Sequence, residues 1–344
     1  MKARNANLEL LRILSMLMIV CYHYAIFGFY GEELALSPNK CFVDLFGMWG
    51  KLGTDIFVLI SGYYLVSSQF KLRRILRMVG TVWFYTIGIL LCFVLFAHLR
   101  PGRTELKLSF FPLLSSHYWF ISFYVLLLLL SPFLNRMLHA LDKRMHTALA
   151  LGLFVLCTVL PEFLHISFAE GSLWLFAALY VCGAWCRLYG GQGHSARRML
   201  IAAALLLLCM GRVVLVDLLG QRSGNMDALI HSTDFMGAYS PFAFALGFLL
   251  LQAFASLPPH SWGAVNLLGS LALGVYLFHG NLLISQGIWQ QLFHCSAHVR
   301  DPLLFPHALG TVLSLYAAGS VIEWLRQKGF GVLWDRLLDR IPGL

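Results

Sequence analysis

The first apolar stretch, residues 8–29, is the sequence feature that most constrains the fold. A helix rises 1.5 Å per residue, so about 20 apolar residues are enough to cross the hydrocarbon core of a bilayer. Arg12 and His23 interrupt this stretch and would lie roughly 16 Å apart along such a helix. Because a charged side chain at mid-membrane costs at least ~2.5 kcal/mol, both residues are candidate functional residues.

Further apolar stretches follow, and they predict an all-α polytopic membrane protein with about ten transmembrane helices. The chain is 59% hydrophobic and only 12% charged, which leaves too little polar surface to cover a soluble globule. The stretch at 147–160, about fourteen residues, suits a tilted or partly interfacial helix better than a full crossing. The expected spans are 8–29, 52–70, 78–97, 117–133, 147–160, 172–186, 199–216, 235–254, 265–286 and 303–322.

The distribution of basic residues predicts the topology. With the amino terminus in the cytoplasm, 17 of the 25 Lys and Arg residues fall on the cytoplasmic side, and both termini are cytoplasmic. The net charge of +9 then reflects membrane topology and contact with lipids, and no nucleic-acid partner is expected. Residues 1–344 are expected to form a single integral-membrane domain, with 322–344 as a short cytoplasmic amphipathic tail.

Several polar residues are expected at similar depth in the outer half of the membrane. Asp55 lies about one turn inside the second span, at a depth close to that of His23. A carboxylate that accepts a hydrogen bond from one imidazole nitrogen would orient His23 as a general base. The alternatives are that Asp55 pairs with Lys51 or caps its own helix. Deeper in this span, Ser61 and the adjacent Gly62 allow close helix approach and a hydroxyl hydrogen bond.

Three other residues extend this outer-half group. His117 and Trp119 begin the fourth span, and His279 lies near the outer end of the ninth. Each also has a structural explanation, because Trp119 and His117 fit an interfacial belt and His279 could bond a backbone carbonyl. The eight cysteines lie mostly in apolar runs without a C-x-x-C pair, which predicts buried thiols and no metal site.

The opposite membrane face has a basic cluster. Arg74 and Arg77 are three residues apart on one helical face beside Lys71, and Arg12 lies at the inner end of the first span. Arginine forks suit phosphates, so these residues are candidates to hold a cytoplasmic nucleotide-bearing ligand. The alternative is that they only set topology and contact anionic lipid.

At these residues the chain resembles the acyltransferase-3 family of integral-membrane acyltransferases. Arg12 and His23 fit the R-x10-H signature of that family, and residues 52–63 resemble its G-x-D-x-F-F-x-x-S-G-[FY] stretch, with Val58 where a second Phe is usual. The pair Arg74 and Arg77 is similar to its R-x-x-R motif. Residues 118–120 (YWF) and 274–279 (GVYLFH) resemble two later motifs, so the resemblance covers essentially the whole chain.

The resemblance implies transfer of an acyl group, most often acetyl, from cytoplasmic acyl-CoA to a hydroxyl of a carbohydrate or glycolipid. It implies that His23 is the catalytic histidine, that Arg12 is a partner in the first helix and that Arg74 and Arg77 contact the CoA phosphates. Lys71 and Arg12 are further candidates to bind this ligand. Ser61, His117, Trp119 and His279 are then candidates for substrate contact, with Asp55 as partner of His23. Acyl-CoA would be a co-substrate, with no permanently bound cofactor and no metal. The expected location is the cell membrane, as a multi-pass protein of the bacterial cytoplasmic membrane. The chain shows no SGNH hydrolase-like domain of the kind fused to some members, so transfer is expected to finish within the membrane domain.

Two other classes of function compete with an enzyme. A transporter or flippase for a sugar-lipid or small anion predicts two related halves with broken spans, and no such symmetry is visible in the sequence. A structural or partner-binding subunit leaves the intramembrane ionisable residues unexplained. The acceptor, the acyl chain, the choice between direct transfer and an acyl-histidine intermediate, and assembly into a homo-oligomer all stay open.

Overall fold

The computed structural model describes residues 5–29, 37–98, 100–115, 117–164, 173–190 and 193–341, and the secondary structure of these residues is entirely helical. The α-helices are α1 (Ala6–Gly28), α2 (Pro38–Gly47), α3 (Gly50–Leu65), α4 (Leu72–Phe96), α5 (Arg103–Phe110), α6 (Trp119–Ala140), α7 (Lys143–Phe154), α8 (Leu160–Leu164), α9 (Leu173–Tyr189), α10 (Ser195–Ser223), α11 (Met226–Ile230), α12 (Pro241–Ala255), α13 (Gly263–His279), α14 (Leu282–Gln286), α15 (Leu304–Lys328) and α16 (Phe330–Leu338). Short π- or 3-10-helical segments cover Val155–Val159, Asp234–Met236, Gly287–Leu292 and Cys295–His298.

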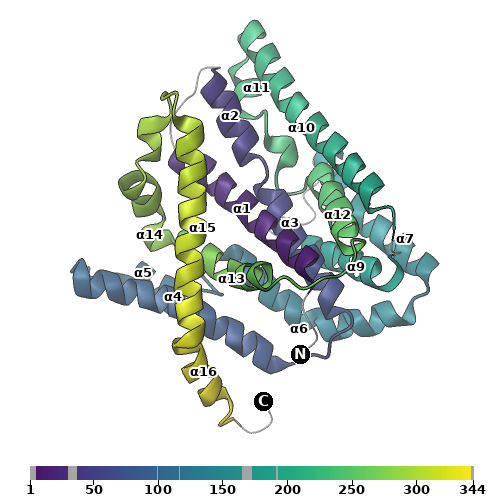
Figure 1. Ribbon diagram of the computed structural model, residues 1–344, viewed down its shortest axis with the longest axis vertical. Coiled ribbons are helices and arrows are strands. Elements are labelled where there is room, and N and C mark those ends of the chain that lie inside the picture. The colour runs from purple at the N-terminus through teal and green to yellow at the C-terminus, as the bar shows by residue number, and fades with distance from the viewer. Residues whose placement is uncertain are drawn as a thin grey trace.

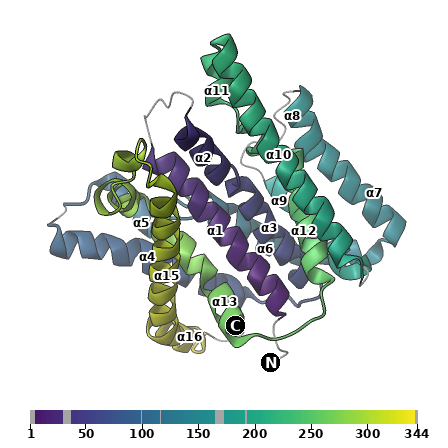
Figure 2. The same ribbon diagram turned by 45° about the horizontal axis from the view of Figure 1, so that its top comes forward.

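Helix α1 lies at the centre of the bundle and packs against α3, α13 and α15 (Figures 1 and 2). Glycines allow two of these contacts to be unusually close. A Cβ atom on Gly53 of α3 would lie 2.5 Å from the carbonyl oxygen of Ser15, and one on Gly269 of α13 would lie 3.0 Å from that of Glu9. Small residues at helix crossings in membranes permit this kind of backbone approach. The position of α1 is therefore fixed by packing along much of its length.

Helices α3 and α9 are packed backbone to backbone. A Cβ atom on Gly62 of α3 would lie 2.3 Å from the carbonyl oxygen of Tyr180, and one on Gly183 of α9 would lie 2.1 Å from that of Leu59. The close helix approach predicted at the Ser61-Gly62 pair is confirmed. The Ser61 hydroxyl donates to the carbonyl of Phe57 at 2.8 Å and lies 2.9 Å from the hydroxyl of Tyr124.

The all-helical membrane architecture is confirmed, but the expected count of ten spans is not. By length and composition, seven helical segments of the described chain can cross a membrane, or eight if one bent pair counts as a span. The expectation was higher because α3, with 16 residues, and α9, with 17, were taken as full spans. The stretch expected to be too short instead belongs to a helical segment of 22 residues, Lys143–Leu164.

The expected span at 265–286 is broken immediately after His279. The segments Gly263–His279 and Leu282–His298 meet at an angle of 75°. Asn281 stabilises the break, because its side chain accepts from the backbone N–H of Leu283 at 2.9 Å and donates to the hydroxyl of Tyr118 at 3.1 Å. Tyr118 in turn donates to the carbonyl of Leu277 at 2.6 Å. The side chain of His279 is thus held at a fixed helix end.

The C-terminal region differs from the expected tail. Helix α15 continues to Lys328, and Glu323 lies buried within it, where it accepts a hydrogen bond from Tyr85 at 3.0 Å. The amphipathic helix is α16, which docks on the start of α4 through a 3.0 Å hydrogen bond from Trp334 to the carbonyl of Leu76. Residues 342–344 of the expected tail lie outside the described residues. Helix α16 and the first turn of α1 lie at the same end of the molecule (Figures 1 and 2).

Candidate active site

A cavity of about 500 Å³ opens beside the C-terminal half of α1. Cavities of this size hold small ligands, most often where a few polar groups converge on an apolar wall. Its wall is formed by α1, α2, α3, α6, α9, α13 and the segment after α11. The polar and aromatic residues that line it are Tyr22, His23, Asp44, Lys51, Thr54, Trp119, Phe120, Phe176, Thr233, Asp234, Tyr239 and Tyr276.

The central polar feature of this cavity is a pair of histidines. Nδ1 of His23 lies 2.9 Å from Nε2 of His279, and Nδ1 of His279 lies 2.6 Å from the carbonyl oxygen of Val275. A carbonyl only accepts, so Nδ1 of His279 carries the proton and its Nε2 is an acceptor in the neutral ring. The proton between the two rings therefore belongs to Nδ1 of His23. This leaves Nε2 of His23 as an unprotonated nitrogen with no hydrogen bond to any other described residue.

The partner of His23 differs from the one expected from the sequence. Asp55 is 2% exposed and lies 3.1 Å from the ammonium group of Lys51, one turn earlier in α3. This is the alternative pairing that the sequence left open. Lys51 also lies 5.9 Å from the ring centroid of Trp119, so it links Asp55 to the cavity wall. Asp55 neutralises a lysine of the wall, and His279 takes the orienting position beside His23.

Two of the other candidates support the site from behind. The side chain of His117 is buried outside the cavity wall, where its Nε2 accepts from the backbone N–H of Leu282 at 3.4 Å. Burial lowers the pKa of His117 to about 4, so this ring is neutral at neutral pH. Ser61 is likewise outside the wall, bonded within α3 and to Tyr124. Of the expected substrate contacts, Trp119 lies in the wall, whereas His279 lies behind His23.

The basic cluster lies at the other end of α3 from the cavity. Lys51 and Thr54 at the start of this helix line the cavity, whereas the cluster begins after the helix has ended. The whole of α3 is 16 residues, or about 24 Å, long. Arg74 is bonded only weakly, at 3.4 Å, to the hydroxyl of Ser68. Arg77 is paired with Asp335 of α16 at 2.6 Å.

Lys71 and Arg74 border a small hollow between the α3–α4 connection, the start of α4 and α6. Both side chains are exposed cations that an anionic ligand can reach at this end of the molecule.

Arg12 is placed differently from these residues. Its guanidinium lies 2.6 Å from a carboxylate oxygen of Glu9, whose side chain is only 3% exposed. The expected grouping of Arg12 with Arg74 and Arg77 is therefore not a contact, and Arg12 serves first to neutralise a buried acid beside α13. Over the described residues, no group of three or more His, Cys, Asp or Glu side chains is placed to hold a metal ion.

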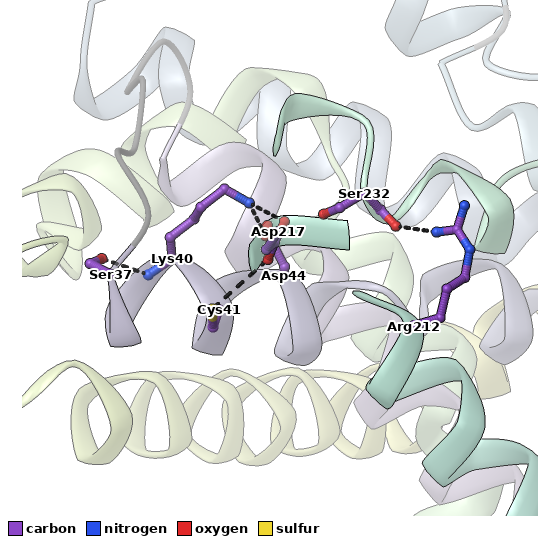
Figure 3. A network of polar contacts seen from close by, with 7 residues as sticks. All are labelled: Ser37, Lys40, Cys41, Asp44, Arg212, Asp217 and Ser232. Carbon is purple, nitrogen blue, oxygen red and sulfur yellow. Dashed lines mark hydrogen bonds and ion pairs between the residues drawn. The ribbon is translucent and has the colours of Figure 1, made fainter. Parts of the chain in front are cut away.

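Sequence reasoning missed two acids in the cavity wall, Asp44 and Asp234. Both lie in segments expected to be outer loops, and no periodicity in the sequence indicates that they face His23. Asp44 is positioned by a buried cluster, shown in Figure 3, in which Lys40 of α2 contacts both Asp44 and Asp217 of α10. The distance from the Lys40 ammonium to Asp217 is 3.0 Å.

These ion pairs hold α2 against α10 and keep Asp44 on the wall. Burial, with a contribution from the neighbouring Asp217, raises the pKa of Asp44 to about 6 despite the opposing effect of Lys40.

The fold and the cavity define a multi-pass helical membrane protein with an oriented histidine facing a ligand-sized cavity. The sequence model of a family described as an acyltransferase domain, Acyl_transf_3, matches residues 5–321. The chain therefore belongs to the acyltransferase-3 family, and it is an acyltransferase by family. Neither the curated proteins nor the solved structures gave a match to the chain.

Proposed function

We propose that this protein transfers an acyl group, most simply acetyl, from acyl-CoA to a hydroxyl of a carbohydrate or glycolipid, with His23 as the catalytic residue. The observation that carries the proposal is the chain of hydrogen bonds from His23 through His279 to the carbonyl of Val275. It fixes His23 in the tautomer whose Nε2 can accept a proton, which is what a general base needs.

In the proposed reaction, Nε2 of His23 removes the proton from the acceptor hydroxyl as its oxygen attacks the thioester carbonyl. A carbon–oxygen bond forms, the carbon–sulfur bond breaks, and the proton passes from His23 to the CoA sulfur, giving an ester and free CoA. His279 accepts from Nδ1 of His23 throughout and so supports the imidazolium that forms. Base catalysis of this type is worth typically 10²- to 10⁴-fold. Attack on the thioester by Nε2 itself, through an acyl-histidine, uses the same geometry.

The donor is proposed to bind by its phosphates at Lys71 and Arg74. Helix α3, about 24 Å long, lies between the cavity and these cations, so a ligand that reaches both must be long, and the extended pantetheine arm of CoA fits that need. The phosphates then face the end of the molecule where α16 and the first turn of α1 lie, and the acceptor enters from the opposite end. With the topology predicted from Lys and Arg, the first end is cytoplasmic.

The test is release of CoA thiol by the purified protein in lipid vesicles, with acetyl-CoA and octyl glycosides as acceptors. The wild-type protein should release thiol and form an acetylated glycoside, and His23→Ala should lower the rate by at least about 10²-fold while remaining folded. Equal activity of the two proteins would reject His23 as the catalytic residue. Binding of a glycolipid without any consumption of acetyl-CoA would favour a transporter.

A further inference from the structure

The cavity beside His23 is acidic, and this charge bears on which acceptors it admits. The acidic and basic side chains of its wall, apart from His23, are those of Asp44, Lys51 and Asp234. Lys51 adds no net charge, because its ammonium lies 3.1 Å from the buried carboxylate of Asp55. The unbalanced charge of the wall therefore comes from the two other residues, one contributed by α2 and one by the turn after α11.

Asp44 is only half compensated by its partner. In the cluster of Figure 3, one ammonium, that of Lys40, serves two carboxylates, those of Asp44 and Asp217. The side chains of Lys40 and Asp217 are 7% and 0% exposed, whereas that of Asp44 is 21% exposed. The excess negative charge of the cluster thus reaches the cavity through Asp44. Arg212, also in Figure 3, does not line the cavity and donates to the carbonyl of Ser232 at 2.7 Å.

Asp234 supplies the second negative charge. Its side chain is 66% exposed, and its partner is His231 at 2.6 Å, a residue with no permanent charge. Apart from His23, the remaining polar groups of the wall are hydroxyls, chiefly those of Tyr22 and Tyr239, and Trp119 offers an aromatic face. Hydroxyls, carboxylates and an indole are groups that can hydrogen-bond and pack against an uncharged sugar ring.

We infer that the cavity selects acceptor sugars that carry no negative charge, admitting neutral and amino sugars and disfavouring uronates and other anionic sugars. The inference rests on the proposed function, since it concerns the acceptor of the same site. A round cavity of about 500 Å³ is about 10 Å across, so a carboxylate inside it lies within about 8 Å of an acidic side chain. At an effective dielectric constant of about 20, and with allowance for solvent screening, this distance corresponds to about tenfold weaker use of an anionic acceptor.

The experiment compares octyl glucoside with two acceptors that each differ from it at one position, by an amine at C2 or by a carboxylate at C6. Octyl glucoside, octyl glucosaminide and octyl glucuronide are supplied with acetyl-CoA to the purified full-length protein in neutral lipid vesicles, and kcat/KM is measured from thiol release. Glucoside and glucosaminide should be used at least about tenfold better than glucuronide. Asp44→Asn should lower the ratio of kcat/KM for octyl glucoside to that for octyl glucuronide several-fold. This substitution leaves Lys40 paired one to one with Asp217. Asp234→Asn, an exposed position, should lower the ratio similarly.

Asp227→Asn is the matched control. Asp227 is 87% exposed, lies 3.5 Å from the same His231 and does not line the cavity, so its loss changes the net charge without changing the wall. The glucoside-to-glucuronide ratio of kcat/KM in Asp227→Asn should equal that of the wild type. Two results overturn the inference alone. One is thiol release that depends on His23 and has equal kcat/KM for all three acceptors. The other is a glucoside-to-glucuronide ratio of kcat/KM that changes as much in Asp227→Asn as in the two variants of the wall. If none of the three acceptors supports thiol release that depends on His23, the proposed function for carbohydrate acceptors is overturned, and the inference with it.

Discussion

The hydrogen bond between the two histidines is the feature whose removal is most informative. In His279→Leu, Nδ1 of His23 loses the acceptor that now lies 2.9 Å away, and its ring is free to change tautomer and to rotate. A net hydrogen bond of about 1.4 kcal/mol corresponds to about tenfold in rate. Loss of orientation adds up to about another tenfold. We therefore expect kcat to fall about 10- to 100-fold, less than in His23→Ala, which removes the proposed base itself.

A matched variant separates orientation from packing. In His279→Gln, the side-chain amide reaches about as far as Nε2 of the imidazole, and its oxygen can accept from His23. Activity should then recover to within a few-fold of wild type. The assay is thiol release from acetyl-CoA with kcat and KM measured separately, alongside thermal unfolding in detergent. Because His279 does not line the cavity, KM for both substrates should change little.

Two results would refute this reasoning. An unchanged kcat in the folded Leu variant would mean that His23 needs no orienting partner. Equal losses in the Leu and Gln variants, with lower thermal stability in both, would mean that His279 acts only by stabilising the break between α13 and α14.

Three further predictions concern other parts of the molecule. Arg74→Ala should raise KM for acetyl-CoA about tenfold with kcat nearly unchanged, because one charge-assisted contact to phosphate is lost; steady-state kinetics at varied acetyl-CoA test this. Gly62→Ala should lower the free energy of unfolding by about 1–3 kcal/mol, because its Cβ would lie 2.3 Å from a backbone oxygen. Gly88→Ala is the control and should not lower it, because the space around Gly88 is open. Discrimination against octyl glucuronide should be strongest at pH 8 and weaken as pH falls through about 6, where Asp44 takes up a proton. The test is the ratio of kcat/KM for octyl glucoside to that for octyl glucuronide, measured across this pH range.

Two residues singled out from the sequence, His23 and Trp119, line the cavity, but the contacts among the candidate residues were not foreseen. Depth along a helix follows from residue number, and on this basis His23 and Asp55 were expected at similar levels. In the structure Gly50 packs against Tyr22 and Gly53 against Ser15, so Asp55 lies deeper along α1 than His23. Depth says nothing about rotation around the helix axis, and Lys51, one turn from Asp55 on the same helix, is the nearer partner for its carboxylate. The partner of His23 comes instead from α13, and only the tertiary arrangement of α1 and α13 brings it there.

The acids of the cavity wall show the same limit more strongly. Asp44 and Asp234 lie in connecting segments, where neither hydrophobic periodicity nor a motif indicates a direction. The position of Asp44 follows from the cluster that joins α2 to α10, through a pairing of Lys40 with Asp217, 177 positions later in the chain. A sequence taken alone shows charged residues in two loops, and it cannot show that one ammonium is shared between two carboxylates.

The separation between the basic cluster and the cavity depends on α3, and this gives its glycines a functional consequence. Gly53 lets α3 approach α1 beside the cavity, and Gly62 lets it approach α9 near the cluster. Because both ends of α3 are packed backbone to backbone, the helix can neither slide nor tilt without a clash. The distance from the phosphates of a CoA molecule bound near Arg74 to His23 would then be fixed. The pantetheine arm would therefore place the thioester carbonyl at a defined position beside Nε2. Reactions that depend on a near-attack geometry lose rate when the position of the reacting carbonyl changes by about 1 Å. The packing of α3 therefore belongs to the proposed catalytic apparatus, although no residue of its glycine contacts touches a reacting atom.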